Sequence, residues 1–136
     1  GRMGAGIAQT FAAAGSSVTI AEASQDAAIS AYRRVAAGLS RAAEKGALEG
    51  NPDAVLARVH TVTSLTELPP DAGLIVEAVP ESLSAKITVL STVEKFVATG
   101  AVLATNTSSL SITELAAALD HPHRFLGMHF FNPVPA

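Results

Sequence analysis

Short apolar runs alternate with longer helical patterns along this chain, and this alternation limits the fold more than any other feature of the sequence. The apolar runs are bounded by glycine, proline or polar residues, which is typical of strands, and they occupy 17–21, 59–63, 74–79, 101–105 and 125–131. Between them, apolar residues recur every three or four positions, as expected for helices that bury one face. Strands that alternate with helices predict an α/β fold with a mostly parallel, doubly wound sheet.

Capping residues and glycines predict where the helices begin and end. Serine and asparagine side chains satisfy the free N–H groups of a first helical turn, and the expected N-caps are Ser24, Asn51 and Ser111. Ser111 also forms a capping box with Glu114. Glycines are expected to end three helices, at Gly15, Gly46 and Gly100. The helices are therefore expected over 4–14, 25–45, 52–57, about 87–100 and 112–119.

The composition excludes several classes of protein. The 136 residues are 49% hydrophobic and 15% charged, which is too apolar and too weakly charged for a disordered chain. No apolar run approaches the roughly 18 residues of a membrane helix. Nine basic and 12 acidic residues argue against a nucleic-acid-binding domain, and the lack of cysteine excludes a thiolate zinc site and a disulfide scaffold. We expect a single soluble, cytoplasmic domain without a metal site.

The two ends of the sequence predict an internal segment of a longer protein. The chain opens on Gly1-Arg2-Met3-Gly4, with neither an initiator methionine nor a strand before it, and it closes directly after an apolar strand. Part of the active site is therefore expected to come from flanking residues.

A glycine-rich helix start and an acid form the first candidate site. Gly1 and Gly4 open the first helix, and Glu22 follows at the end of the next strand. Dinucleotide folds need such glycines beside a pyrophosphate, a helix N-terminus with free N–H groups, and an acid for the adenosine ribose. Glu22 would favour NAD over NADP, because a carboxylate repels a 2′-phosphate. The alternative is that small residues here serve only close packing.

Polar residues at the ends of two later strands form the second candidate site. Asn106 to Ser109 follow a buried strand, at the edge where open α/β sheets bind ligands. The alternative for them is turn and capping chemistry. His129 lies near the exit of the last strand, and imidazole is the side chain best suited to move a proton near neutral pH. Its alternative is a hydrogen-bonded core histidine. A serine hydrolase is disfavoured, because Ser108 and Ser109 lack the G-x-S-x-G context of a nucleophile elbow.

Four stretches together resemble the N-terminal, NAD-binding domain of the 3-hydroxyacyl-CoA dehydrogenase family. They read GRMGAGIAQTFAAAG, VEAVPESLSAK, ATNTSSLSITELA and GMHFFNPVP, and the resemblance covers essentially the whole chain. It implies a Rossmann-type fold whose first strand precedes Gly1. It also implies a helical domain beyond Ala136 that forms a homodimer.

The resemblance also implies the site residues. The implied cofactor contacts are Gly1, Met3, Gly4, Glu22, Glu81, Lys86, Asn106 and Ser108. The implied catalytic residues are His129, Ser108 and Asn132, and the implied substrate contacts are Ser108 and Lys45. The sequence departs from the family at three of its positions: Glu22 replaces the usual aspartate, Gly38 stands where a serine contacts CoA, and Pro80 replaces a small aliphatic residue.

The implied activity is NAD-dependent oxidation of a 3-hydroxyacyl-CoA, or the reverse reduction, in fatty-acid or butanoate metabolism. The family glutamate that pairs with the histidine is expected beyond Ala136, so the isolated segment is predicted to be nearly inactive. Two alternatives are a non-catalytic, crystallin-like nucleotide-binding relative and a dehydrogenase of a non-CoA hydroxy acid. Intact Ser108, His129 and Asn132 argue against the first, since a structural role does not need them.

Overall fold

The computed structural model describes residues 1–135, which form two compact units. The first contains residues 1–64 and the segment from 131 onward, and the second contains residues 65–130. Each unit has its own sheet, with strand order β1-β2 in the first and β3-β4-β5 in the second. Every strand pair is parallel. The α/β class with parallel strands is therefore confirmed, and the described strands form two sheets.

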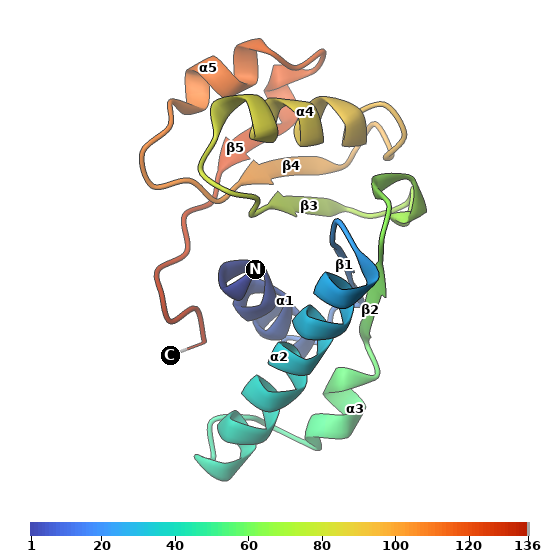
Figure 1. The fold of residues 1–136 in the computed structure, drawn as a ribbon, viewed down its shortest axis with the longest axis vertical. Coiled ribbons are helices and arrows are strands. Elements are labelled where there is room, and N and C mark those ends of the chain that lie inside the picture. Colours follow the sequence, from blue (N-terminus) through green and yellow to red (C-terminus); the bar gives the residue numbers. More distant parts are fainter. Residues whose placement is uncertain (136) are drawn as a thin grey trace. The chain divides into compact units, whose positions relative to one another are not determined.

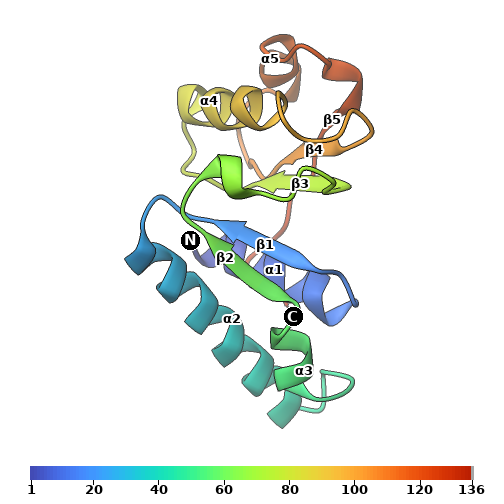
Figure 2. The same ribbon diagram turned by 90° about the vertical axis from the view of Figure 1, so that its right-hand side faces the viewer.

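The first unit packs its helices over a pair of strands (Figures 1 and 2). Its elements are α1 (Arg2–Ala13), β1 (Val18–Ala21), α2 (Gln25–Glu44), α3 (Pro52–Leu56) and β2 (Val59–Val62). Small side chains on α1, among them Ala8 and Ala12, let it lie against Val35 and Leu39 of α2 and Val59 of β2 in one hydrophobic core. Small residues of α1 thus do serve close packing.

A left-handed glycine and three capping side chains fix the helix ends as expected. Gly15 has a φ of 97°, a conformation that residues with a Cβ rarely adopt, and it follows α1 directly after Ala14. At the N-termini, Ser24 Oγ accepts from Ala27 N at 3.3 Å and Asn51 Oδ1 accepts from Asp53 N at 2.8 Å. In the second unit, Ser111 Oγ accepts from Glu114 N at 3.2 Å, which confirms the predicted start of α5.

The second unit places two helices over one face of a three-stranded sheet (Figures 1 and 2). Its strands are β3 (Leu74–Glu77), β4 (Val102–Thr105) and β5 (Phe125–Gly127). The helices are α4 (Leu83–Val93) and α5 (Ile112–Ala117), with short 3-10 turns at η1 (Leu65–Glu67) and η2 (Pro122–Arg124). Leu90, Leu103 and Leu115 join α4, β4 and α5 in a core that water does not reach. This core fixes the strand ends that carry the candidate site.

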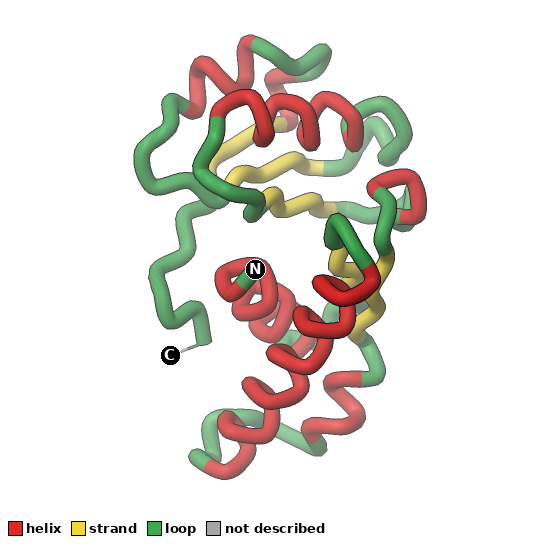
Figure 3. The backbone as a smooth tube through the Cα atoms, in the orientation of Figure 1, coloured by secondary structure: helices red, strands yellow, loops and turns green. Residues whose placement is uncertain are grey.

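Two elements end well before the residues at which the sequence predicts their ends. Helix α4 ends at Val93, and a tight turn follows it, in which Phe96 N donates to Val93 O. Strand β5 ends at Gly127 instead of reaching 131, because the N–H of Phe130 donates to the Asn106 side chain and not to a neighbouring strand. The chain from 128 to 135 is therefore loop (Figure 3). Within residues 1–135, no helix is long and apolar enough to cross a bilayer.

Candidate active site

The carboxyl ends of β3 and β4 enclose a buried ion pair. Lys86 reaches over from α4, and its Nζ lies 2.8 Å from Oε1 and 3.1 Å from Oε2 of Glu77, the last residue of β3. Both side chains are fully buried. The same ammonium donates to the carbonyl oxygens of Val79 at 3.2 Å and Asn106 at 3.3 Å, and it lies 3.4 Å from Glu81 Oε2. The lysine is thus surrounded by oxygen acceptors of the protein, as a buried charge requires.

Glu81 holds the loop that follows β4. Its Oε1 accepts from the hydroxyl of Thr107, from the hydroxyl of Ser109 at 3.1 Å, and from the N–H groups of Ser108 at 3.1 Å and Ser109 at 3.3 Å. The Thr107 hydroxyl contributes most to lowering the pKa of Glu81 from 4.5 to about 2, and the Lys86 charge acts in the same direction. The side chain is 37% exposed. Part of the Glu81 side chain is therefore accessible to a ligand.

The anchoring of this loop should persist to unusually low pH. Because the folded pKa of Glu81 lies below its ordinary value, the stabilisation from its ionised form is complete above about pH 4.5 and is lost as the pH falls toward 2. We expect a carboxyl carbon NMR titration of Glu81 to show a midpoint near 2. The matched variant Thr107→Val should move the midpoint upward, because it removes the largest contribution. A wild-type midpoint at or above 4.5 would contradict the assignment.

Two hydrogen bonds tie the loop after β5 to the end of β4. Met128 N donates to Thr105 O at 2.9 Å, and Phe130 N donates to Asn106 Oδ1 at 2.9 Å. His129 lies between these two anchored residues. The Asn106 side chain thus holds the segment that contains His129. Asn106 is also one of the residues expected to bind the cofactor.

Ser108 and His129 lie at the same edge of the second sheet. They follow β4 and β5, which are parallel neighbours with Thr105 opposite Gly127. Both residues are exposed. The prediction of a shared edge is confirmed, and the alternative of a core histidine is wrong. Turn chemistry is present as well, since Thr107 Oγ1 accepts from Leu110 N at 3.1 Å. In this turn Ser108 uses its backbone N–H, which donates to Glu81 Oε1 at 3.1 Å.

In the first unit, the glycine stretch lies beside the predicted acid. Glu22 Oε1 lies 2.8 Å from the backbone nitrogen of Gly1, and the Glu22 side chain is 20% exposed. Helix α1 has no side-chain cap and no acidic residue in its first turn, which contains Met3 and Gly4. An uncapped helix N-terminus favours a phosphate, and a nearby carboxylate suits ribose hydroxyls. Free N–H donors at the helix N-terminus and a carboxylate acceptor together fit the pyrophosphate and adenosine ribose of a dinucleotide.

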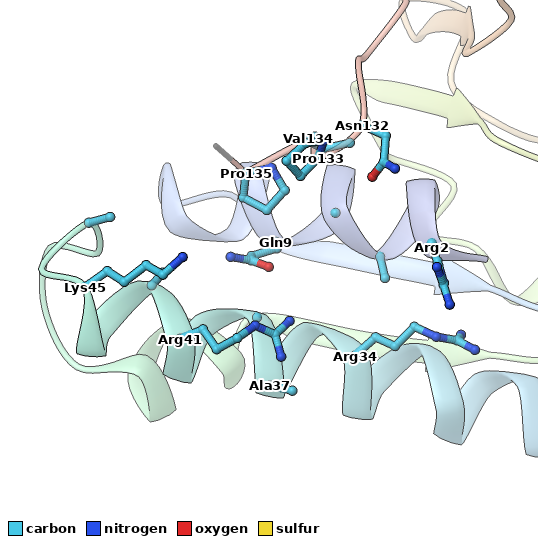
Figure 4. Close-up of a pocket in the computed structure, with 15 residues that line it drawn as sticks. Arg2, Gln9, Arg34, Ala37, Arg41, Lys45, Asn132, Pro133, Val134 and Pro135 are labelled. Atoms are coloured by element: carbon cyan, nitrogen blue, oxygen red, sulfur yellow. The ribbon is translucent and has the colours of Figure 1, made fainter.

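A basic cavity of about 660 Å³ opens between α1, α2 and the segment 132–135 (Figure 4). Four cationic side chains line it, namely Arg2, Arg34, Arg41 and Lys45. None of its described lining residues is acidic. The expected substrate contact Lys45 and the expected catalytic residue Asn132 both lie in this lining. The segment can approach α1 because Gly6 has no Cβ, which would stand 2.9 Å from Val134 Cβ.

Gln9 fills the floor of this cavity where the sequence departs from its family pattern. Gln9 is buried, with 6% of its surface exposed. Its Oε1 lies 2.0 Å from the place that a Cβ on Gly38 would take. A serine at 38 would displace the amide, so Gly38 is the residue that this arrangement requires. The amide places a hydrogen-bonding group in the wall of the cavity.

The buried Glu77–Lys86 pair and most of the basic cavity were not predicted from the sequence, although the sequence contains a signal for each. Lys86, Leu90 and Val93 are spaced along the buried stripe of α4, and a lysine on such a stripe indicates a buried acidic partner. Glu77 interrupts an otherwise apolar strand in the same way. Arg34, Arg41 and Lys45 recur at helical spacing on one face of α2 and meet in the cavity.

Comparison with known proteins decides the family. The family model described as 3-hydroxyacyl-CoA dehydrogenase, NAD binding domain, matches residues 1–136. The chain belongs to this family. NAD is therefore the cofactor of this domain, and the uncapped N-terminus of α1 with the nearby Glu22 carboxylate suits it.

This NAD-binding domain resembles proteins from bacteria and mammals. It is 40% identical over 136 residues to the probable 3-hydroxybutyryl-CoA dehydrogenase of Bacillus subtilis, covering 99% of this chain and 47% of the relative. It is 38% identical over 142 residues to the mitochondrial hydroxyacyl-coenzyme A dehydrogenase of Sus scrofa, covering 99% and 45%. The crystal structure of the (S)-3-hydroxybutyryl-CoA dehydrogenase of Ralstonia eutropha matches with a TM-score of 0.92 at 39% identity, covering 100% and 48%. The chain thus spans about half the length of the relatives it matches.

Proposed function

We propose that the whole protein to which this NAD-binding domain belongs interconverts a 3-hydroxyacyl-CoA and the corresponding 3-oxoacyl-CoA. The observation that carries the proposal is the pair of exposed side chains, Ser108 and His129, at the carboxyl ends of two adjacent parallel strands. A hydroxyl and an imidazole at one edge suit a reaction in which an alcohol loses a proton. The names of the relatives support the same chemistry.

The chain's own residues divide the work as follows. His129 accepts the proton of the 3-hydroxyl group, and Ser108 donates a hydrogen bond to the oxygen that becomes the carbonyl. NAD, when bound, supplies the acceptor for the hydride that leaves C3. The N-terminus of α1, with Gly1, Met3 and Gly4, holds its pyrophosphate, and Glu22 holds the adenosine ribose. The partly exposed side chain of Glu81 contacts the nicotinamide half of the cofactor.

The basic cavity of the first unit binds the phosphates of coenzyme A. Lys45, Arg41, Arg34 and Arg2 supply positive charge without a competing carboxylate in the described lining. Arginine forks and lysine ammonium groups are the usual protein partners of phosphate oxygens. The amide of Gln9, which also lines the cavity, adds a neutral donor and acceptor between α1 and α2 (Figure 4). This support for a CoA ester distinguishes the proposal from a dehydrogenase of a free hydroxy acid.

Residues outside this chain complete the protein. We propose a helical domain after this one, which forms a homodimer and supplies the carboxylate that orients His129. The relatives are about twice as long as this chain, which leaves room for such a domain. Asn132 acts beside the substrate in the finished site.

The decisive experiment measures NADH oxidation by the whole protein with acetoacetyl-CoA and with free acetoacetate. We expect turnover with acetoacetyl-CoA and a kcat/KM at least a hundredfold lower with acetoacetate, because the free acid has no nucleotide for the basic cavity. Equal values would favour a dehydrogenase of a non-CoA substrate. Tight NADH binding without turnover of either would favour the non-catalytic, crystallin-like relative.

A further inference from the structure

Glu77 is closed to solvent, and its carboxylate contacts three segments around the loop that contains Ser108. The Val79 N–H donates to Oε1 at 2.6 Å, and the Thr105 hydroxyl donates to Oε2 at 2.6 Å. Lys86 donates to both oxygens. Because the carboxylate is fully buried and each oxygen has two protein donors, Glu77 cannot itself bind substrate or cofactor.

Lys86 connects Glu77 to the loop that contains Ser108. Its Nζ donates to the carbonyl of Asn106 and lies 3.4 Å from Glu81 Oε2. Glu81 in turn accepts from the backbone N–H of Ser108. A chain of charged contacts thus runs from Glu77 through Lys86 and Glu81 to Ser108. Asn106 extends it to the histidine segment through the bond from Phe130 N.

We propose that Glu77 is a positioning residue that sets the places of Ser108 and His129 through Lys86. Stability alone does not account for a buried pair, since apolar residues of similar volume are often as stabilising as buried ions. An apolar pair would lack the directed bonds to Asn106 and Glu81. The functional side of this inference rests on the proposed dehydrogenase activity, whereas the ordering of the loop does not.

The test replaces both charges at once in the whole protein. The double variant Glu77→Gln/Lys86→Met keeps side chains of similar size and removes both fully buried charges together. We expect kcat for acetoacetyl-CoA reduction to fall at least fivefold while its KM changes less than twofold, because the basic cavity is untouched. In the absence of cofactor and substrate, amide hydrogen exchange at Ser108 and Ser109 should become at least tenfold faster.

A matched control is Glu94→Gln. Glu94 is also a buried carboxylate of the second unit, at 6% exposure, but its oxygens accept from Asp120 N and His121 N, away from the Ser108 loop. We expect wild-type exchange at Ser108 and Ser109 in this variant, whatever its melting temperature. Wild-type exchange in the Glu77→Gln/Lys86→Met variant would overturn the inference. An inactive wild-type protein would instead overturn the proposed function, and the exchange measurement would still decide this one.

A milder substitution covers the case in which the double variant does not fold. Thr105→Val removes only the hydroxyl that donates to Glu77 Oε2, at a fully buried position where valine has the same shape. We expect faster exchange at Ser108 than in the wild type, and restoration by Thr105→Ser, which keeps the hydroxyl. Exchange at Ser108 that is equal in the valine and serine variants would contradict the role of Glu77.

Discussion

Charge reversal of Arg41 and Lys45 to glutamate in the whole protein should raise KM for acetoacetyl-CoA about 10- to 100-fold. Each charge-assisted hydrogen bond to a phosphate contributes about 1.5–3 kcal/mol when shielded and less at an exposed site, and about 1.4 kcal/mol corresponds to a factor of ten. Both side chains are exposed at the rim of the basic cavity, so we expect the lower part of that range for each. KM for NADH should stay within twofold.

The control for this double variant is Arg33→Glu. Arg33 lies on α2 and is exposed, but it is not among the cavity-lining residues, so it tests the general effect of lost positive charge. We expect KM for acetoacetyl-CoA to rise less than threefold. Raising the ionic strength should increase KM of the wild type and leave the Arg41→Glu/Lys45→Glu variant almost unchanged. Equal KM values for both variants would place the CoA phosphates elsewhere.

Features that depend only on neighbouring residues, such as the helix N-caps, could be predicted from the sequence. The N-caps Ser24, Asn51 and Ser111 are each recognised from a few neighbouring residues, and each forms the expected hydrogen bond. The parallel strands follow from their alternation with helices, because a parallel connection requires a crossover. The end of β5 was not predictable in this way. Its last ladder bond is replaced by one to Asn106, which is distant in sequence.

The same distinction between local and long-range contacts applies to the candidate site. A single sequence shows that Ser108 and His129 follow strands, and parallel pairing then brings those strand ends to one edge. The enclosure of Lys86 depends on residues distant in sequence, such as Glu77 and Asn106, and the family resemblance implied a cofactor contact for it. In the structure this side chain is fully buried and acts within the protein, and its cofactor role is still a prediction.

Replacement of His129 by glutamine in the whole protein should lower kcat by about 10²- to 10⁴-fold, the usual contribution of a positioned general acid or base. Glutamine is similar in size and keeps hydrogen-bonding capacity, but it cannot take up the 3-hydroxyl proton. The flanking anchors at Met128 and Phe130 use backbone N–H groups, so the substitution leaves them in place. NADH binding, followed by fluorescence, should keep a Kd within twofold of the wild type.

The control for the His129→Gln variant is His123→Gln. His123 is also exposed, but it lies in η2, before β5, at the opposite end of that strand from His129. Loss of a histidine there should leave kcat within twofold, because no strand end with Ser108 or Asn106 lies at that edge. If His129→Gln retained full kcat, proton transfer would have to involve another group, and the exposed imidazole between two anchored residues would be a feature of the loop alone. A parallel loss of NADH binding would show that the substitution disturbs the fold.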